Sequence, residues 1–298
     1  MKRWIAVDWG TTNFRAFLMQ GNKCIERCAQ GPGLLQIEQG SFEQELSRLL
    51  QPWFAQASYP IIMAGMVGSQ QGWHEVPYVE APCTFASLAE QAFSFTTRWA
   101  SPVWIIPGVR CHSPYQQPDV MRGEEVQLAG LSAINGSARY QIILPGTHSK
   151  HVLIDNQSIS HFSTYMTGEL FALLSQHSIL GRALPPQEYS LEVFHFAIEL
   201  AQRKTPLSHQ LFSARTYRLN KEIAEQHIHS YLSGLLIGAE LVTCSTTQPI
   251  WCVGSPKLTE NYAQAAKYLG INLQTIDGDE CFIRGISHLY AHIAGEKP

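Results

Sequence analysis

Residues 4–19 read WIAVDWGTTNFRAFLM, and this stretch decides the fold. Two apolar runs flank a polar turn in it, a pattern that predicts two short strands joined by a tight connection. The Gly21-Asn22 pair that follows is typical of a hairpin turn. Residues 23–30 complete a predicted set of three consecutive strands at the start of the chain.

The rest of the chain alternates predicted strands and helices. Helical spacing begins at Ser41, and further segments are expected as strands at 60–65, 102–106, 140–144, 150–154, 158–163, 249–253 and 272–276. Helices are expected at 121–134, over much of 167–244, at 255–269 and from Asp279 onward. Short strands followed by a helix occur twice, near residue 1 and near residue 140. This repetition predicts two similar α/β halves with a ligand-binding cleft between them.

Composition excludes several classes of protein. The chain has 298 residues, 45% hydrophobic and 15% charged, and a formal net charge of −3. A weakly acidic chain without a Lys/Arg block has no electrostatic footprint for nucleic acid or for an anionic membrane surface. No apolar stretch approaches the roughly 20 residues that span a bilayer. Asp8 and Arg15 are charged residues where a signal peptide needs an apolar centre, so we do not expect secretion by that route.

Cysteine usage and missing motifs narrow the possibilities further. The seven cysteines form no C-x-x-C pair, which favours free thiols in a reducing compartment. We therefore expect a cytoplasmic protein. Absence of a G-x-x-x-x-G-K-[ST] loop, G-x-G-x-x-G, G-x-S-x-G and H-E-x-x-H argues against P-loop NTPases, Rossmann enzymes, α/β-hydrolases and zincins.

The first candidate motif is the turn after the first strand. A carboxylate such as Asp8 at a strand end can hold Mg²⁺, largely through water. Gly10 lets the backbone approach a phosphate, while Thr11 and Thr12 supply hydroxyl donors and Arg15 supplies a positive charge. The alternative is a plain hairpin with a favourable turn.

A second turn offers the same ingredients. The segment LPGTHSK at 144–150 contains Gly146, Thr147, His148 and Lys150 between two predicted strands. Together with the first turn, it is interpreted as a second phosphate clamp. The same residues are also compatible with an ordinary hairpin turn that binds no phosphate.

The third motif is Arg122-Gly123-Glu124-Glu125 at a predicted helix start. A carboxylate there can accept a hydroxyl proton during phosphoryl transfer. The alternative is an acidic residue that interacts favourably with the helix dipole.

The fourth motif is Gly254-Ser255-Pro256, between a predicted strand and a helix. A glycine at this point can admit the flat face of an adenine ring. A tight strand-to-helix turn, with Ser255 as N-cap and proline at the first helical position, is equally compatible.

These four elements, in this order, resemble the actin/hexokinase/heat-shock-chaperone ATPase superfamily. More closely, the chain resembles the 2-dehydro-3-deoxygalactonokinase family from end to end. The segments that carry this resemblance are DWGTTNFRAFLM (8–19), AGMVGSQQGWHEVPYVEAP (64–82), DVMRGEEVQLAG (119–130), LPGTHSKHVLID (144–155) and TYMTGELF (164–171).

The resemblance implies a two-lobed, actin-like (ribonuclease H-like) α/β fold, with a mixed sheet and flanking helices in each lobe. The active site would lie in the inter-lobe cleft. We expect residues 1–108 to form an N-terminal lobe with the first phosphate hairpin and part of the sugar pocket. Residues 109–298 would form a C-terminal lobe with the catalytic carboxylate, the second phosphate hairpin and the adenosine segment.

The implied activity is ATP- and Mg²⁺-dependent phosphorylation of 2-dehydro-3-deoxy-D-galactonate on its 6-hydroxyl, in galactonate catabolism. Asp8 would organise Mg²⁺, and Glu124 would be the base, although Glu125 and Asp119 stay open as alternatives. The residues expected around ATP are Gly10, Thr11, Thr12, Arg15, Gly146, Thr147, His148, Lys150, Gly254 and Ser255.

A sugar acid needs a cation and many neutral donors. In the loop 65–78, Ser69, Gln70 and Tyr78 supply polar groups, and Trp73 can cover an apolar sugar face. Arg122 is the expected partner of the carboxylate. Thr167 and Glu169 would close the far side of the pocket.

Two other functions remain open. A kinase of another sugar or sugar acid (2-dehydro-3-deoxygluconate, a pentulose or a hexulose) shares the phosphate motifs. A non-catalytic nucleotide-binding switch is the second. Neither nucleic acid nor membrane is an expected partner, and a homodimer stays an open alternative to a monomer.

Overall fold

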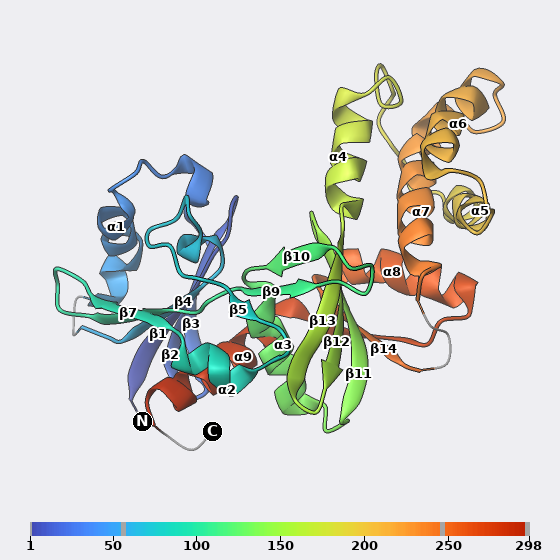
Figure 1. Cartoon of the computed structure of the whole chain (residues 1–298). Helices are drawn as coiled ribbons and strands as arrows, with labels where there is room; N and C mark the ends of the chain where they lie inside the picture. Colours follow the sequence, from blue (N-terminus) through green and yellow to red (C-terminus); the bar gives the residue numbers. More distant parts are fainter. Residues whose placement is uncertain (1, 55–57, 245–247, 296–298) are drawn as a thin grey trace. The chain divides into compact units, whose positions relative to one another are not determined.

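The computed structural model describes residues 2–54, 58–244 and 248–295, and the chain folds into two compact units. Unit 1 comprises Met1–Arg139, Leu153–Phe162 and Gly278–Pro298, and unit 2 comprises Tyr140–Val152 and Ser163–Asp277. Figure 1 shows the elements of both.

Unit 1 is built on a six-stranded sheet. Its strands are β1 (Arg3–Trp9), β2 (Phe14–Gln20), β3 (Lys23–Cys28), β4 (Ile61–Ala64), β7 (Phe93–Thr96) and β8 (Pro102–Ile105), in the order β3-β2-β1-β4-β8-β7. β1 pairs antiparallel with β2 and parallel with β4. The buried centre of β1 explains why the apolar run in the sequence forms the middle of the sheet.

Helix α1 (Phe42–Phe54) is amphipathic and covers part of this sheet. It buries Phe42, Leu46, Leu49, Leu50 and Trp53 against residues of β1 and β4 in one hydrophobic core. A small sheet with the order β10-β9-β5 adds β5 (Val79–Glu80), β9 (Val109–His112) and β10 (Pro118–Met121) to unit 1. The remaining elements are α2 (Phe85–Glu90) and the short helices η1 (Leu34–Gln36) and η2 (Met66–Gly68).

Helices α3 (Glu124–Ile134) and α9 (Gly278–Ile293) pack backbone to backbone within unit 1. A Cβ atom on Gly130 would lie 1.8 Å from the carbonyl oxygen of Cys281, and one on Gly285 would lie 1.8 Å from that of Val126. This close packing places the C-terminal helix and α3 in the same unit as β1. The boundary expected after Gly108 therefore falls inside unit 1 instead of between units.

The second six-stranded sheet has the order β15-β14-β11-β12-β13-β6. Its strands are β6 (Cys83–Thr84), β11 (Arg139–Leu144), β12 (Ser149–Asp155), β13 (Ser158–Tyr165), β14 (Ile250–Gly254) and β15 (Leu273–Asp277). As in the first six-stranded sheet, three consecutive strands are followed in the sheet by a strand parallel to the first of them. The predicted repetition of one α/β pattern is thus confirmed.

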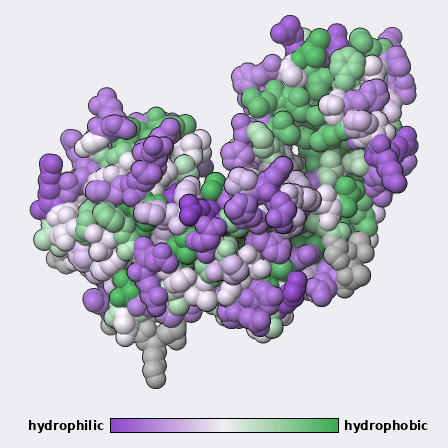
Figure 2. All heavy atoms as spheres, in the orientation of Figure 1, coloured by the Kyte–Doolittle hydropathy of each residue, from purple (hydrophilic) through white to green (hydrophobic). Residues whose placement is uncertain are grey.

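Unit 2 contains a group of helices. They are α4 (Thr167–His177), α5 (Leu191–Ala201), α6 (Leu207–Leu219), η3 (Glu225–His227), α7 (Ile228–Leu241) and α8 (Pro256–Leu269). Buried α7 lies close to α5, because a Cβ on Gly234 would meet the carbonyl oxygen of Phe194 at 2.3 Å. Figure 2 shows apolar side chains gathered over this helical group. Among the helices that the structure describes, none is both long and apolar enough to cross a membrane.

Candidate active site

Asp8 stands near the end of β1, opposite Arg15 of β2 and beside Ala64 of β4. Two glycines near Asp8 have a positive φ angle: Gly65 (φ +96°), directly after β4, and Gly123 (φ +111°), directly before α3. A Cβ on Gly65 would lie 2.8 Å from the carbonyl oxygen of Trp9, and one on Gly123 would lie 3.3 Å from the Cα of Gly65. Any larger residue would separate these segments, so the glycines bring the start of α3 next to Asp8.

The result is a small pocket within unit 1, with a volume of about 190 Å³. It is lined by Asp8, Gly10, Gly65, Arg122, Gly123, Glu124, Gln127 and Phe282. Two predicted motifs, more than 100 residues apart in the sequence, therefore contribute to one pocket: the first turn and the start of α3. Phe282 was missed, because an aromatic residue on a helix gives no functional signal in one sequence, and Gln127 was part of the third motif but was given no role.

Arg122 has an unusual environment in this pocket. Its Nη2 donates to the carbonyl oxygen of Val76 at 2.7 Å, and its guanidinium carbon lies 4.2 Å from the centre of the Tyr78 ring. Its Nε and Nη1 are buried without a hydrogen-bond partner in the structure. Unpaired buried donors are costly, so an acceptor that reached them would stabilise this side chain.

The two neighbouring glutamates lie in different environments. Glu124 lines the pocket and accepts a hydrogen bond from the backbone N–H of Arg122 at 3.1 Å. Glu125 is completely buried, and both its carboxylate oxygens accept from the N–H of Gly123. Burial, and next the charge of Glu124, raise the pKa of Glu125 to about 8. Asp119 lies on β10 and is not among the residues that line the pocket.

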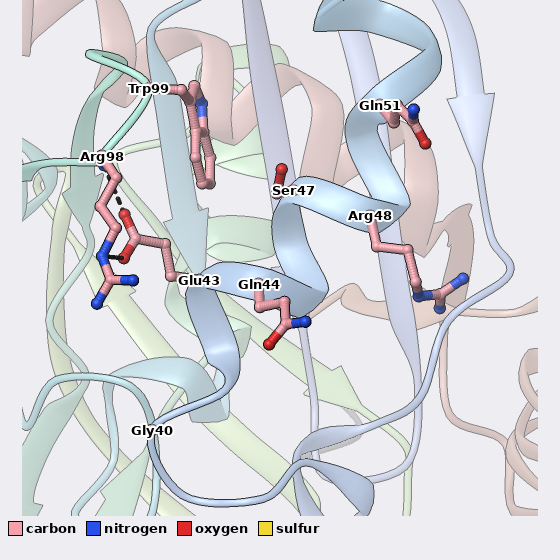
Figure 3. A pocket seen from close by; sticks show the side chains of 8 residues that line it. All are labelled: Gly40, Glu43, Gln44, Ser47, Arg48, Gln51, Arg98 and Trp99. Atoms are coloured by element: carbon pink, nitrogen blue, oxygen red, sulfur yellow. Dashed lines mark hydrogen bonds and ion pairs between the residues drawn. The ribbon is translucent and has the colours of Figure 1, made fainter.

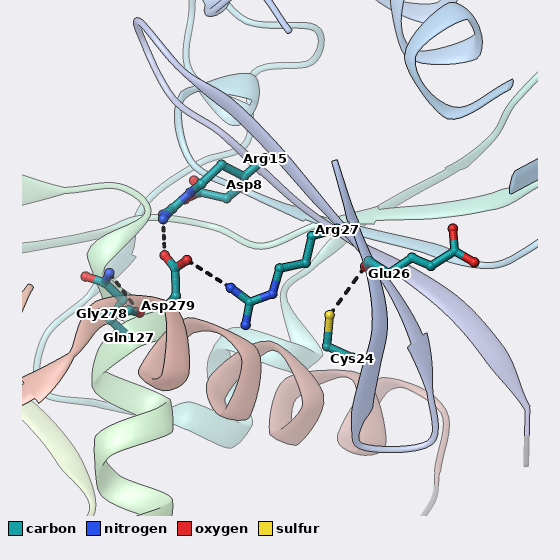
Figure 4. A network of polar contacts seen from close by, with 8 residues as sticks. All are labelled: Asp8, Arg15, Cys24, Glu26, Arg27, Gln127, Gly278 and Asp279. Carbon is teal, nitrogen blue, oxygen red and sulfur yellow. Dashed lines mark hydrogen bonds and ion pairs between the residues drawn. The ribbon is translucent and has the colours of Figure 1, made fainter. Parts of the chain in front are cut away.

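A chain of ion pairs surrounds Asp8 (Figure 4). Arg15 donates to the Asp8 carboxylate through Nε, at 3.1 Å, and through Nη2, and it also pairs with Asp279 through Nη1. Arg27 lies 3.4 Å from the second oxygen of Asp279. These side chains are partly exposed, between 19% and 57%. Asp279, in the first turn of α9, was not predicted for this site, because an acidic residue at a helix start is common.

Other predicted residues of unit 1 lie elsewhere. Thr11 and Thr12 are exposed in the turn, and Gln70 is exposed. Ser69 is buried, with a hydroxyl that has no partner in the structure. Trp73 packs edge-on against Phe95, with 4.8 Å between ring centres, and belongs to the periphery of the hydrophobic core instead of the pocket lining.

The predicted residues of unit 2 gather around the turn between β11 and β12. A Cβ on Gly168 would lie 2.3 Å from the carbonyl oxygen of Gly146, so the start of α4 touches the turn. The N–H of Glu169 donates to the carbonyl oxygen of Thr147 at 2.9 Å, and its carboxylate lies 2.5 Å from Nε2 of His148. His148 is exposed and Glu169 is partly exposed.

Gly254 belongs to the same neighbourhood within unit 2. A Cβ on it would meet the ring of Pro145 at 3.4 Å, so the end of β14 lies beside the turn. Ser255 is exposed and caps α8 by position without a side-chain hydrogen bond. Lys150 and Thr167 are buried: the Lys150 ammonium donates to Thr164 at 2.7 Å, and the Thr167 hydroxyl donates to Glu240. Neither of these two side chains is exposed at the turn.

A larger hollow, of about 570 Å³, lies on the outer side of α1 (Figure 3). It is lined by Gly40, Glu43, Gln44, Ser47, Arg48, Gln51, Arg98 and Trp99. Its arginines already pair with carboxylates, Arg98 with Glu43 at 3.2 Å and Arg48 with Glu45. No predicted motif contributes to it. The smaller pocket beside Asp8, and not this larger hollow, therefore holds the groups that a phosphoryl transfer needs.

Magnesium and nucleotide phosphates fit the groups that are present. Mg²⁺ is commonly held by one or two protein carboxylates together with phosphates and water. Asp8 offers such a carboxylate beside Gly10, where a Cβ would have only one neighbour, at 3.6 Å. Within residues 2–54, 58–244 and 248–295, no cluster of three or more His, Cys, Asp or Glu could hold a metal by itself. The donor set therefore suits a phosphate-bound Mg²⁺ better than a metal cage made by the protein alone.

Known proteins share this sequence and fold. The family described as 2-keto-3-deoxy-galactonokinase matches residues 8–289. The 2-dehydro-3-deoxygalactonokinase of Escherichia coli (strain K12) is 38% identical, over 97% of this chain and 99% of its own. A crystal structure of a Sinorhizobium meliloti protein assigned as a 2-dehydro-3-deoxygalactonokinase superposes with a TM-score of 0.90. It is 32% identical and covers 97% of this chain and 99% of its own.

A more distant structure shows the fold alone. The activator of 2-hydroxyisocaproyl-CoA dehydratase from Clostridium difficile, solved with bound ADPNP, has a TM-score of 0.51 at 11% identity and covers 97% of this chain and 94% of its own. The two-part α/β fold expected from the sequence is thus confirmed, and the chain belongs to the 2-keto-3-deoxy-galactonokinase family.

Proposed function

We propose that this protein transfers the γ-phosphoryl group of ATP to the 6-hydroxyl of 2-dehydro-3-deoxy-D-galactonate, as a Mg²⁺-dependent kinase of galactonate catabolism in the cytoplasm. The observation that carries the proposal is the pocket of unit 1, where Asp8, Glu124 and Arg122 meet. Family membership supports the same activity.

Arg122 is the proposed partner of the substrate carboxylate. Its Nε and Nη1 are buried and unpartnered, and the N–H groups of a guanidinium form charge-assisted hydrogen bonds with a carboxylate. A neutral sugar would leave these buried donors unpaired, so the pocket should discriminate strongly in favour of an acid.

Glu124 is the proposed base. A base must reach the substrate and be ionised, and Glu124 lines the pocket whereas Glu125 faces the interior. Glu125, with a pKa near 8, holds its proton at neutral pH and cannot accept another. Asp119 lacks a place in the pocket lining. In this proposal Glu124 accepts the proton as the 6-hydroxyl attacks the γ-phosphorus.

Asp8 and the two turns would hold the nucleotide. Asp8 would hold Mg²⁺, which supplies charge neutralisation at the phosphates when it is bound. Asp8 would then exchange its contact with Arg15 for the ion, and Asp279 would retain Arg15 nearby. In unit 2, Gly146, Thr147 and His148 would contact phosphates and Gly254 the adenine. Positioning and charge stabilisation provide most of the rate in such reactions.

The test is ADP formation from ATP by the wild-type protein with 2-dehydro-3-deoxygalactonate, its gluconate epimer and several neutral ketoses. We expect turnover with the galactonate derivative, a kcat/KM at least about tenfold lower with the epimer, and only background rates with neutral sugars. Turnover with a neutral ketose and none with either acid would contradict the proposal. Measuring product by ³¹P NMR identifies the phosphorylated hydroxyl.

A further inference from the structure

Helix α7 contains a completely buried carboxylate that the proposed reaction does not use. Glu240 is the only acidic residue of α7, and its side chain is 1% exposed. An ionised carboxylate is strongly disfavoured in an apolar interior unless donors satisfy all of its oxygens. The hydrogen-bond donors around Glu240 therefore indicate the role of its carboxylate.

Four side-chain donors from three other elements of unit 2 converge on this carboxylate. One oxygen accepts from the Ser149 hydroxyl and from Nε2 of His151, each at 2.7 Å. The other accepts from the hydroxyls of Tyr262, at 2.8 Å, and Thr167. Each oxygen thus has two partners, which uses the full acceptor capacity of a carboxylate.

Two of these donors flank the turn at residues 145–148. Ser149 follows it directly on β12, and Thr167 is the first residue of α4. Next to Thr167, Gly168 lies against Gly146, and the Glu169 N–H donates to the carbonyl oxygen of Thr147. One carboxylate therefore ties the strand that leaves the turn to the helix that packs on it.

We propose that Glu240 is a positioning residue for the nucleotide: it fixes Ser149 and Thr167, and so holds the turn at 145–148 in the shape that receives the phosphates of ATP. The inference rests on the proposed function, which assigns this turn to ATP. Glu240 itself touches neither substrate, because its oxygens are buried and saturated.

The charge state of the cluster is consistent with this role. Burial alone lowers the pKa of His151, but hydrogen bonds to Cys244 and Glu240 outweigh it and raise the pKa to about 9. Burial alone raises the pKa of Glu240, but contacts with His151 and then Thr167 and Ser149 outweigh it and lower the pKa. Near pH 7 the pair is therefore a carboxylate and an imidazolium. Tyr165, whose ring lies 4.5 Å from that of His151, and Cys252 also face the cluster.

The experiment compares two variants that remove a donor from the same carboxylate oxygen. Thr167→Val removes the donor on α4, whose next two residues contact the turn, and Tyr262→Phe removes the donor on α8, which packs elsewhere on the carboxylate. For Thr167→Val, Ser149→Ala and Glu240→Gln, we expect the KM for ATP and the Kd for Mg·ADP, measured by calorimetry, to rise about tenfold. The KM for the sugar acid should change less than about twofold.

Tyr262→Phe should lower the melting temperature as much as Thr167→Val while leaving the KM for ATP within about twofold. In hydrogen exchange, amides at 145–150 should exchange faster in Thr167→Val than in Tyr262→Phe. Equal effects of both variants on the KM for ATP would mean that the cluster only stabilises unit 2, and the inference would be overturned. If Glu240→Gln does not fold, Thr167→Val and Ser149→Ala still test the inference, because each removes one donor and leaves the carboxylate in place.

Gly146→Val separates this inference from the proposed function. A Cβ at Gly146 has open space around it, with its one neighbour at 4.0 Å, so the variant should fold and obstruct only a ligand. An unchanged KM for ATP in Gly146→Val would contradict the assignment of the turn. A raised KM there, with unchanged values in Thr167→Val, Ser149→Ala and any folded Glu240→Gln, would overturn the role of Glu240 alone.

Discussion

Each unit has one carboxylate at the centre of its site, and the two are held in opposite ways. Asp8 in unit 1 is partly exposed, and its partner Arg15 is shared with Asp279. Glu240 in unit 2 is buried and has four donors. Exposed ion pairs contribute little stability and exchange partners readily, whereas a buried network is rigid. The comparison indicates that Asp8 can exchange its contact with Arg15 for a bound ion. Glu240 instead keeps the residues around the turn at 145–148 in fixed positions.

Asp8→Asn should have the largest effect on activity. The amide keeps the size of the side chain but removes the charge that would hold Mg²⁺, so we expect kcat to fall about 10³-fold. Because the pair with Arg15 is partly exposed, the melting temperature should change by no more than about 2 °C. Steady-state kinetics over a Mg²⁺ titration and calorimetric melting check both parts. A large loss of stability with little loss of rate would reverse the comparison.

Arg122→Met should weaken the binding of the acid substrate. A charge-assisted hydrogen bond to the substrate carboxylate would be lost, at roughly 1.5–3 kcal/mol, so the KM for the sugar acid should rise about 10- to 100-fold. The KM for ATP should stay within about threefold. Tyr78→Phe is a suitable control, since it keeps the ring stacked on the guanidinium. An equal rise in both KM values would argue against a carboxylate site at Arg122.

The buried pair in unit 2 should show its effect in stability. The folded-state pKa of His151, about 9, lies above its ordinary value of 6.5. Its contribution is therefore complete below about pH 6.5 and is lost as pH rises through 9. On the order of 2 kcal/mol should disappear between pH 7 and 10 in wild type and much less in His151→Asn. Urea unfolding at several pH values measures this, and parallel pH curves for the two proteins would contradict it.

Arg27→Gln should have the smallest effect. Arg27 is 57% exposed and only extends the pairs of Asp279, at 3.4 Å. The free energy of unfolding should change by less than about 0.5 kcal/mol, and kcat by less than twofold. Arg203→Gln, in the exposed helical pair with Glu199, provides a matched control. A larger effect of Arg27→Gln than of this control would show that the pairs of unit 1 act together.

The sequence was sufficient for the strands and helices that have strong patterns. β1, β2, β4 and β8 are apolar runs that end at Gly, Pro or polar turns, and α1 has helical spacing of large apolar residues. The short elements β7, β9, β10 and α2 were missed, because four to six residues give too little periodicity.

Long-range partners are what one sequence could not provide. Asp279 pairs with Arg15 across 264 positions, and this pair depends on the close packing of α9 on α3 in the structure. The expected boundary after Gly108 failed to include α3 and α9 in unit 1 for the same reason. Glu240 did carry a signal, as a single carboxylate in an apolar helix, but its four donors are scattered from Ser149 to Tyr262. Only the fold brings them together.

The most direct test of the central claim is single-turnover phosphorylation by Glu124→Gln, with Glu125→Gln as the matched control. The substitutions are chemically identical and adjacent, but only Glu124 lines the pocket. If Glu124 is the base for transfer to the sugar acid, its variant should lose about 10²- to 10⁴-fold in rate, while Glu125→Gln stays within about tenfold of wild type. Wild-type rates in Glu124→Gln, or a greater loss in Glu125→Gln, would contradict the claim.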